Sequence, residues 1–133
     1  MEIIDNIYYK DYENLLECAI EFSYENIGNK EILYIWEGYF DSIMHGIPFK
    51  NESFYGLVKE YQQDTGWYDE KWQIPDLDDA INQLNHFDVE ILKLQENNYD
   101  FLDHKLLYEV LERIVQFLER AKKLNCKVYM DVY

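Results

Sequence analysis

The stretch DHKLLYEVLERIVQFLERAKKL, residues 103–124, decides the expected fold because it carries the longest helical pattern in the chain. Its apolar side chains recur at the three- and four-residue spacing of one helix face. They are Leu107, Val110, Leu111, Ile114, Phe117, Leu118 and Ala121. Lys122 and Lys123 lie in the last turn, where the helix dipole favours cations. We therefore expect a helix from about Asp103 to Leu124 with this apolar face buried.

Four segments before it also show helical spacing of apolar residues, and glycines or a proline follow several of them as helix ends. They are Asp11 to Asn26, Asn29 to about His45, about Ser53 to Thr65, and Asp76 to about Gln95, the last with a possible break near Asn85–His86. Asp11, Asn29 and Asp76 are residue types that cap helix starts, and Asp79 stands third after Asp76.

The last seven residues, 127–133, alternate between apolar and polar side chains, which is typical of a strand. Such a strand needs a partner, for example Glu2–Ile4, because its backbone groups must be hydrogen-bonded; otherwise it lies on the helices as an extended tail. The sequence predicts a mainly α fold. We expect residues 1–133 to form a single helical domain, a bundle of five or six helices, possibly with a short C-terminal strand.

Charge limits the partners of the chain. With 27 acids against 12 bases its formal net charge is −15, which disfavours nucleic acid and anionic membrane surfaces and favours a basic protein.

No run of about 20 apolar residues that could span a bilayer is present. The start MEIIDNIYYK is acidic where a signal peptide needs cations, so we expect a cytoplasmic protein. Cys18 and Cys126 have no metal-binding spacing and are expected to be free thiols.

No catalytic motif is found, so we expect no enzyme and no cofactor. The chain has no nucleophile elbow and no phosphate-binding glycine loop. His45 follows Asp41 by four residues and His104 follows Asp100 by four, so each pair shares a helix face. The repeated Glu-x-x-His pattern of di-iron bundles is absent, and we expect no metal site.

The segment DTGWYDEKWQIPDLDD, residues 64–79, combines large aromatic side chains with carboxylates, as protein-binding surfaces do. Its candidate partner-binding residues are Asp64, Trp67, Tyr68, Asp69, Glu70, Trp72, Asp76, Asp78 and Asp79. In the alternative interpretation Trp67 and Trp72 are buried in the core, while Asp76 and Asp79 serve the start of a helix.

A second patch of the same character lies near the N-terminus and would widen the surface. It consists of Tyr8, Tyr9, Asp11, Tyr12 and Glu13.

A small acidic chain rich in Tyr and Trp, with segments such as GWYDEKW (66–72), resembles the immunity proteins of contact-dependent growth inhibition and related polymorphic toxin systems. The resemblance is one of general character and extends over the whole chain. It implies that the protein neutralises a cognate toxin domain, often a basic nuclease, by covering its active site. A DNA-mimicking acidic inhibitor and a regulatory or scaffold subunit of a stable complex are the alternatives.

The ending LERAKKLNCKVYMDVY (118–133) is also similar to the last helix and strand of barstar-like ribonuclease inhibitors. The sequence shows neither the preceding parallel strands nor the helix signature of that family, so no residue roles are carried over.

Overall fold

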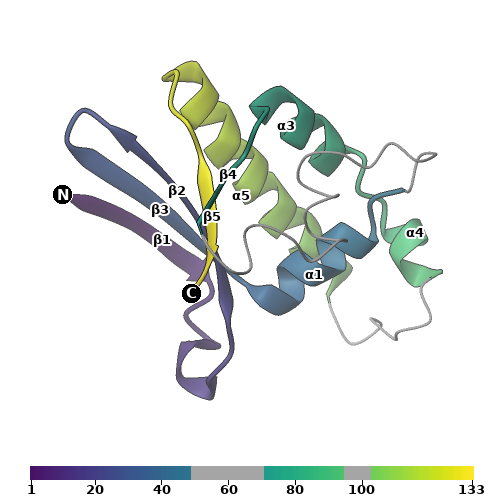
Figure 1. Cartoon of the computed structure of the whole chain (residues 1–133). Helices are drawn as coiled ribbons and strands as arrows, with labels where there is room; N and C mark the ends of the chain where they lie inside the picture. Colours follow the sequence, from purple (N-terminus) through teal and green to yellow (C-terminus); the bar gives the residue numbers. More distant parts are fainter. Residues whose placement is uncertain (49–70, 95–102) are drawn as a thin grey trace.

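A five-stranded mixed sheet forms the centre of the protein in the computed structural model, which describes residues 1–48, 71–94 and 103–133 (Figure 1). The strand order is β1-β3-β2-β5-β4. The strands are β1 (Glu2–Tyr8), β2 (Ala19–Asn26), β3 (Asn29–Trp36), β4 (Trp72–Gln73) and β5 (Tyr129–Val132). The helices are α1 (Glu37–His45), α3 (Leu77–Asn85), α4 (Val89–Lys93) and α5 (His104–Lys123), and η1 (Glu13–Leu15) is a short 3₁₀ turn.

The prediction of a mainly helical bundle was wrong, because the first 36 residues form three strands and a short 3₁₀ turn instead of α-helices. Ile20, Phe22 and Tyr24 of β2 alternate with other residues and are buried on one face of the sheet. This alternation, with β-branched and aromatic residues on the buried face, fits a pleated strand. Over so short a run the same apolar residues also match helical spacing. The predicted helix from Asp11 to Asn26 is therefore η1 followed by β2.

The glycine expected to end that helix instead closes a β-hairpin. Asn26 pairs with Asn29, and the two residues between them, Ile27 and Gly28, have φ values of 46° and 79°. Positive φ at both central residues is the signature of a type I′ turn, which matches the twist of the strands it joins. Asn29 consequently begins β3 and does not cap a helix.

The predicted helix from Asn29 to His45 is half strand and half helix. β3 runs to Trp36 and α1 follows directly, ending at Gly46 as predicted. Gly46 leaves room for the ring of Phe87, since a Cβ at this position would lie 2.5 Å from the Phe87 Cδ2.

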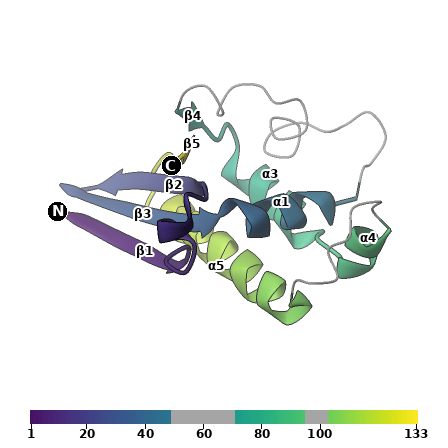
Figure 2. The same ribbon diagram turned by 90° about the horizontal axis from the view of Figure 1, so that it is seen from below.

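The predicted final helix is confirmed as α5. The Asp103 carboxylate accepts hydrogen bonds from the backbone N–H groups of Lys105 and Leu106, and all the residues of the predicted apolar face are buried. Figure 2 shows α5 lying along one face of the sheet. The core lies between them, where the Phe117 ring of α5 contacts those of Phe22 and Tyr24, with centroids 6.5 and 5.0 Å apart.

The helix predicted from Asp76 starts where expected and breaks at the predicted place. Asp76 caps α3, which ends at Asn85, and α4 starts at Val89. The helix predicted from Ser53 to Thr65 lies outside the described residues.

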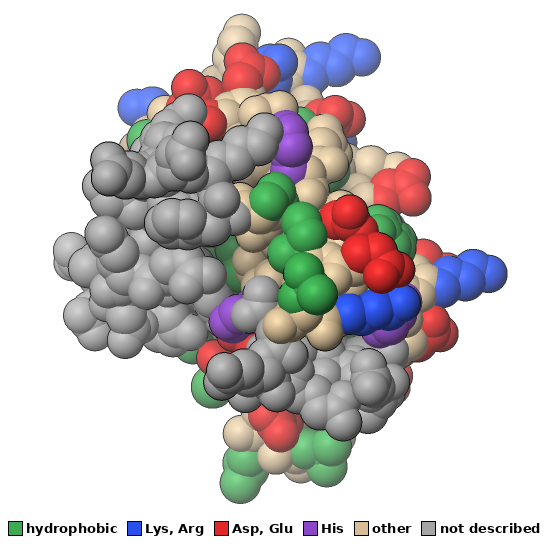
Figure 3. Space-filling model, turned by 90° about the vertical axis from the view of Figure 1, so that its right-hand side faces the viewer, with side chains coloured by type: hydrophobic (Ala, Val, Ile, Leu, Met, Phe, Trp, Pro, Cys, Tyr) green, Lys and Arg blue, Asp and Glu red, His purple; other side chains and the backbone are tan. Residues whose placement is uncertain are grey.

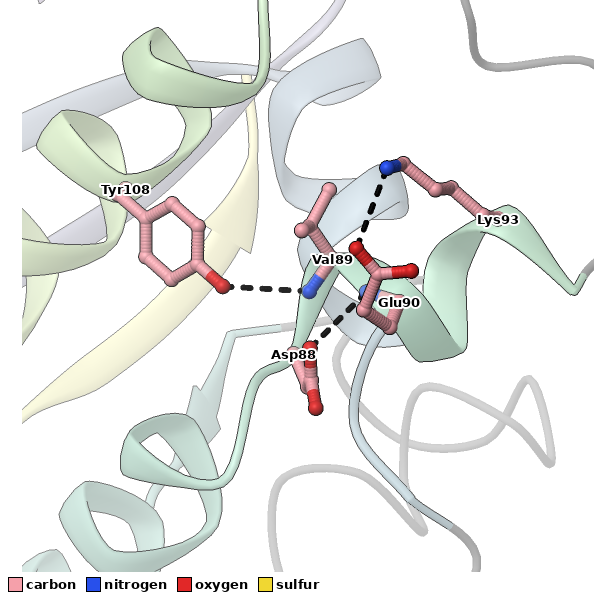
Figure 4. A network of polar contacts seen from close by, with 5 residues as sticks. All are labelled: Asp88, Val89, Glu90, Lys93 and Tyr108. Carbon is pink, nitrogen blue, oxygen red and sulfur yellow. Dashed lines mark hydrogen bonds and ion pairs between the residues drawn. The ribbon is translucent and has the colours of Figure 1, made fainter.

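The short helix α4 is attached through its first turn (Figure 4). The Asp88 carboxylate accepts a hydrogen bond from the Glu90 N–H at 2.9 Å, and the Tyr108 hydroxyl of α5 accepts one from the Val89 N–H at 3.2 Å. Both groups would otherwise lack an intrahelical partner. Lys93 donates to the Glu90 carboxylate on the outer side.

The C-terminal residues do form a strand, but its partners differ from the suggested one. β5 pairs antiparallel with β2 on one side and with β4 on the other, whereas Glu2–Ile4 belongs to β1. β1 pairs in parallel with β3 at one edge of the sheet. This parallel pair was not recognised in the sequence.

No described residue pairs with the outer edge of β1, and its apolar side chains are open to solvent. Ile3, Ile4 and Ile7 are 48%, 51% and 50% exposed. None of the helices described is long and apolar enough to cross a membrane.

Candidate partner-binding surface

Five of the nine candidate residues in the acidic segment lie outside the described residues. They are Asp64, Trp67, Tyr68, Asp69 and Glu70. The other four lie on β4 and on the first turn of α3: Trp72, Asp76, Asp78 and Asp79.

Trp72 is half-buried and packs against the core. It pairs with Met130 of β5, which is fully buried, and therefore points to the face of the sheet that α5 covers. This position agrees with the alternative interpretation for this tryptophan, that of a packing residue.

The three carboxylates at the start of α3 each have an intramolecular contact. Asp76 accepts a hydrogen bond from the Asp79 N–H at 3.1 Å, and Asp79 accepts one from the Gln83 amide at 3.1 Å. Burial, followed by the nearby charge of Asp76, raises the pKa of Asp79. Asp78 forms an ion pair with Lys122 of α5, which raises the pKa of Lys122. Both partners are well exposed, so the pair adds little stability.

All residues of the second acidic and aromatic patch lie in the described part of the chain. Residues 9–18, here called the anchored loop, connect β1 to β2 and project beyond the end of the sheet (Figure 1). The Tyr12 ring stacks in parallel on Trp36 of β3 with centroids 3.9 Å apart. Tyr39 of α1 meets both rings edge-on, and its hydroxyl lies 3.2 Å from that of Tyr12. These rings hold the first half of the loop against the strand–helix junction.

Gly38 makes this arrangement possible. A Cβ at residue 38 would lie 2.5 Å from the Cζ2 and Cζ3 atoms of Trp36, too close for any real contact. The group that Gly38 admits is the Trp36 indole. Among the described residues the buried Nε1 of that indole has no hydrogen-bond partner.

Tyr9, the first residue of the loop, holds the second half of the loop through Glu17. Only 4% of it is exposed, and its hydroxyl donates a hydrogen bond of 2.7 Å to the Glu17 carbonyl. Its ring lies against Tyr34 and Tyr133, with centroids 6.2 and 6.1 Å away. The loop is therefore held at both ends by buried or half-buried tyrosines.

Two leucines at the tip of the anchored loop face solvent. Leu15 is 64% and Leu16 is 98% exposed, and Leu16 has the left-handed conformation with φ 59° and ψ 28°. This conformation costs a branched L-residue about 1 kcal/mol or more, and Leu16 gains almost no burial in return. Asp11, Glu13 and Glu17, which are close to the two leucines in the chain, are also exposed. An exposed apolar centre with an acidic rim has the composition of a protein-binding site.

The sequence interpretation found Tyr9, Asp11, Tyr12 and Glu13 but missed the two leucines. Both leucines lie in the helix predicted from Asp11 to Asn26, and their spacing fits the buried face of such a helix. A pair of leucines within a run of acids was the available signal.

No family model matches the chain, and searches of curated proteins and of solved structures found no match. The function has to be argued from the surface itself.

Charges on the face that carries α4 are mixed, with acidic, basic and apolar side chains interspersed over its described part (Figure 3). Within residues 1–48, 71–94 and 103–133, no group of three or more His, Cys, Asp or Glu side chains is placed to hold a metal. His45 instead contacts Asp41, with its Nδ1 3.5 Å from the carboxylate and 2.8 Å from the carbonyl oxygen. Neither Cys18 nor Cys126 forms a disulfide.

Proposed function

We propose that the protein is a cytoplasmic immunity protein that binds a cognate basic toxin domain, of the nuclease kind, and covers its active site. The observation that carries this proposal is the anchored loop, which presents Leu15 and Leu16 within a rim of carboxylates. The net charge of −15 adds a long-range attraction for a basic partner.

The anchored loop has what a high-affinity contact requires. The leucines supply apolar area that a partner can desolvate, and the surrounding carboxylates steer a cationic surface toward them. Stacking of Tyr12 on Trp36 and the hydrogen bond from Tyr9 hold the loop in shape before binding. Little conformational entropy is then lost when the complex forms.

The acidic segment contributes the second part of the proposed surface. Asp64, Trp67, Tyr68, Asp69 and Glu70 are retained as partner-binding residues, with Asp76, Asp78 and Asp79 adding charge at the start of α3. Trp72 is a weaker candidate because it packs on the core. In the proposed mechanism carboxylates take the place of substrate phosphates against the Lys and Arg side chains of the toxin.

The test compares Leu16→Gly with Ile27→Gly. Both residues are more than nine-tenths exposed and have positive φ, so glycine relieves the same backbone strain at both. Ile27 lies in the hairpin turn at the far end of β2 and serves as the matched control. The tagged chain is expressed in its source cell, and the proteins that co-purify are identified at low and high salt.

A single basic partner is expected, and Leu16→Gly should weaken its binding by at least about 2 kcal/mol, which is about 30-fold, while Ile27→Gly leaves it unchanged. Equal affinity of both variants would exclude the loop from the interface. Binding of several unrelated basic proteins would instead indicate a DNA-mimicking inhibitor. A partner whose binding is insensitive to salt, and without which the chain self-associates, would indicate a subunit of a stable complex.

A further inference from the structure

A hollow of about 510 Å³ lies where the chain turns from α5 into β5. Its walls come from the later part of β2, the start of β3, the residue before β4, and the turn after α5. It is separate from the anchored loop, since β2 carries the loop at its beginning and the hollow near its end. Ser23, on the hollow, is five residues along β2 from Cys18, a distance of about 17 Å in a strand.

The charge of this hollow is opposite to that of the chain. Lys30, Lys71 and Lys127 line it, and Glu25 is the one carboxylate among its described lining residues. In the described part of the chain none of the three lysines has a carboxylate within 4 Å, whereas Arg113, Arg120 and Lys122 each form an ion pair. The Lys71 ammonium lies over the Tyr129 ring, 5.1 Å from its centroid.

Neutral hydrogen-bond donors accompany the lysines. Ser23 is 2% exposed and borders the hollow. Asn125, an exposed residue with φ 56°, also lines the hollow. Ammonium groups together with hydroxyl and amide donors are the groups that coordinate phosphate oxygens.

We propose that this hollow binds the phosphate group of a small molecule, of the size of a sugar phosphate or a mononucleotide. The volume lies within the range of small-molecule sites. A nucleic acid does not fit the charge distribution, because its further phosphates would extend over the acidic surface beyond the hollow. A compact anion is attracted mainly by the charges of the three lysines, because salt screens charges that lie more than about 8 Å away. The site goes beyond the proposed toxin-binding function and does not depend on it.

Cys126 allows binding to be measured on the unmodified protein. It borders the hollow and is half-buried, whereas Cys18 is exposed near the anchored loop. Alkylation by the neutral reagent iodoacetamide is followed at both cysteines by peptide mass spectrometry. Inorganic phosphate, pyrophosphate and AMP are added in turn, with sodium chloride keeping the ionic strength constant.

We expect at least one of these anions to slow Cys126 alkylation about threefold or more in a saturable way, while the Cys18 rate does not change. Protection by inorganic phosphate or pyrophosphate would identify a site for the free anion, and protection by AMP alone a site for a phosphorylated metabolite. Absence of protection by all three would overturn the proposal.

Charge-neutralising variants show whether the lysines are responsible. Lys30→Gln combined with Lys127→Gln should weaken protection about tenfold or more, because two charge-assisted contacts are lost. Lys105→Gln, on the exposed start of α5, is the matched control and should protect as the wild type does. Equal protection in the double variant and the control would mean a general ionic effect and would also overturn the proposal. Broadening of the ³¹P resonance of the bound anion provides a readout that does not depend on the thiol.

Discussion

Replacing Gly38 by Ala tests whether the shape of the anchored loop depends on a residue outside it. Gly38 lies in the first turn of α1 and none of its atoms belongs to the proposed interface. The added methyl group would lie 2.5 Å from Trp36 Cζ2 and Cζ3, so the indole has to move away. Movement of that ring disrupts its stack with Tyr12 and its edge contact with Tyr39.

The expected magnitude follows from these contacts. Each aromatic pair contributes about 0.5–1.5 kcal/mol, so loss of two pairs costs about 2 kcal/mol. Alanine is better than glycine in a helix by at most about 1 kcal/mol, and by less in a first turn. Gly38→Ala should therefore lower the free energy of unfolding by about 1 kcal/mol or more, although helix propensity alone predicts an increase.

Urea unfolding measures the stability, and amide hydrogen exchange at Tyr12 and Leu15 measures the order of the loop. These two N–H groups donate to the carbonyls of Tyr9 and Tyr12, so a loosened loop should exchange faster. Trp36→Leu is the matched background, in which Gly38→Ala should no longer destabilise because the ring is absent. A Gly38→Ala protein as stable as the wild type, with unchanged exchange at both amides, would refute the reasoning.

The remaining predictions concern the helix start and the tyrosines. Asp76→Ala should cost about 1 kcal/mol because it removes the cap of α3. Asp78→Asn should lower the stability much less, because its ion pair with Lys122 is exposed. Urea unfolding of both variants checks the difference, and equal losses would contradict it. Burial, followed by the Glu21 charge, raises the pKa of Tyr34 to about 12, and burial also raises the pKa of Tyr24 and Tyr39. The folded state therefore retains protons that the unfolded chain releases near pH 10, so the free energy of unfolding should fall as pH rises from about 10 to about 12. Tyr34→Phe should make this fall shallower in urea titrations across that range, and an identical slope would exclude Tyr34 as a contributor.

The parts of the fold that were predictable are those with one dominant pattern. In α5 the apolar face recurs over about four turns, too long for a strand, and Asp103 marks the start of the helix. The helix start at Asp76 and the break after Asn85 were also predictable, because local side chains determine them. Each feature depends on neighbours within a few residues.

The β2–β3 hairpin was missed because its signals conflict. Type I′ turns favour Asn-Gly at their centre, and Ile27 occupies the position where Asn is typical. The apolar residues of β3 continue into α1 without an intervening loop, so a strand and a helix together resembled one long helix. Their high content of Ile, Tyr and Trp favoured strands and was the better guide.

The candidate surface was predictable in composition but not in geometry. Tyr9, Asp11 and Tyr12 were recognised from local sequence, yet the stacking of Tyr12 on Trp36 joins residues 24 positions apart. The hairpin and the parallel β1–β3 pair together bring Trp36 to the base of the loop. The exposure of Leu16 likewise depends on its left-handed backbone conformation. Leucine rarely adopts this conformation, so it could not be predicted from the sequence.

The free edge of β1 has a consequence for how the protein behaves at high concentration. Half-exposed isoleucines beside backbone groups that no described residue pairs with can add a strand from another copy and start aggregation. At neutral pH two copies that each carry a net charge of −15 repel one another before such strands can meet. Near the isoelectric point of about 4.4 that repulsion vanishes. The acidity proposed to attract a toxin would then also serve as the colloidal protection of the molecule, which acidification or high salt removes.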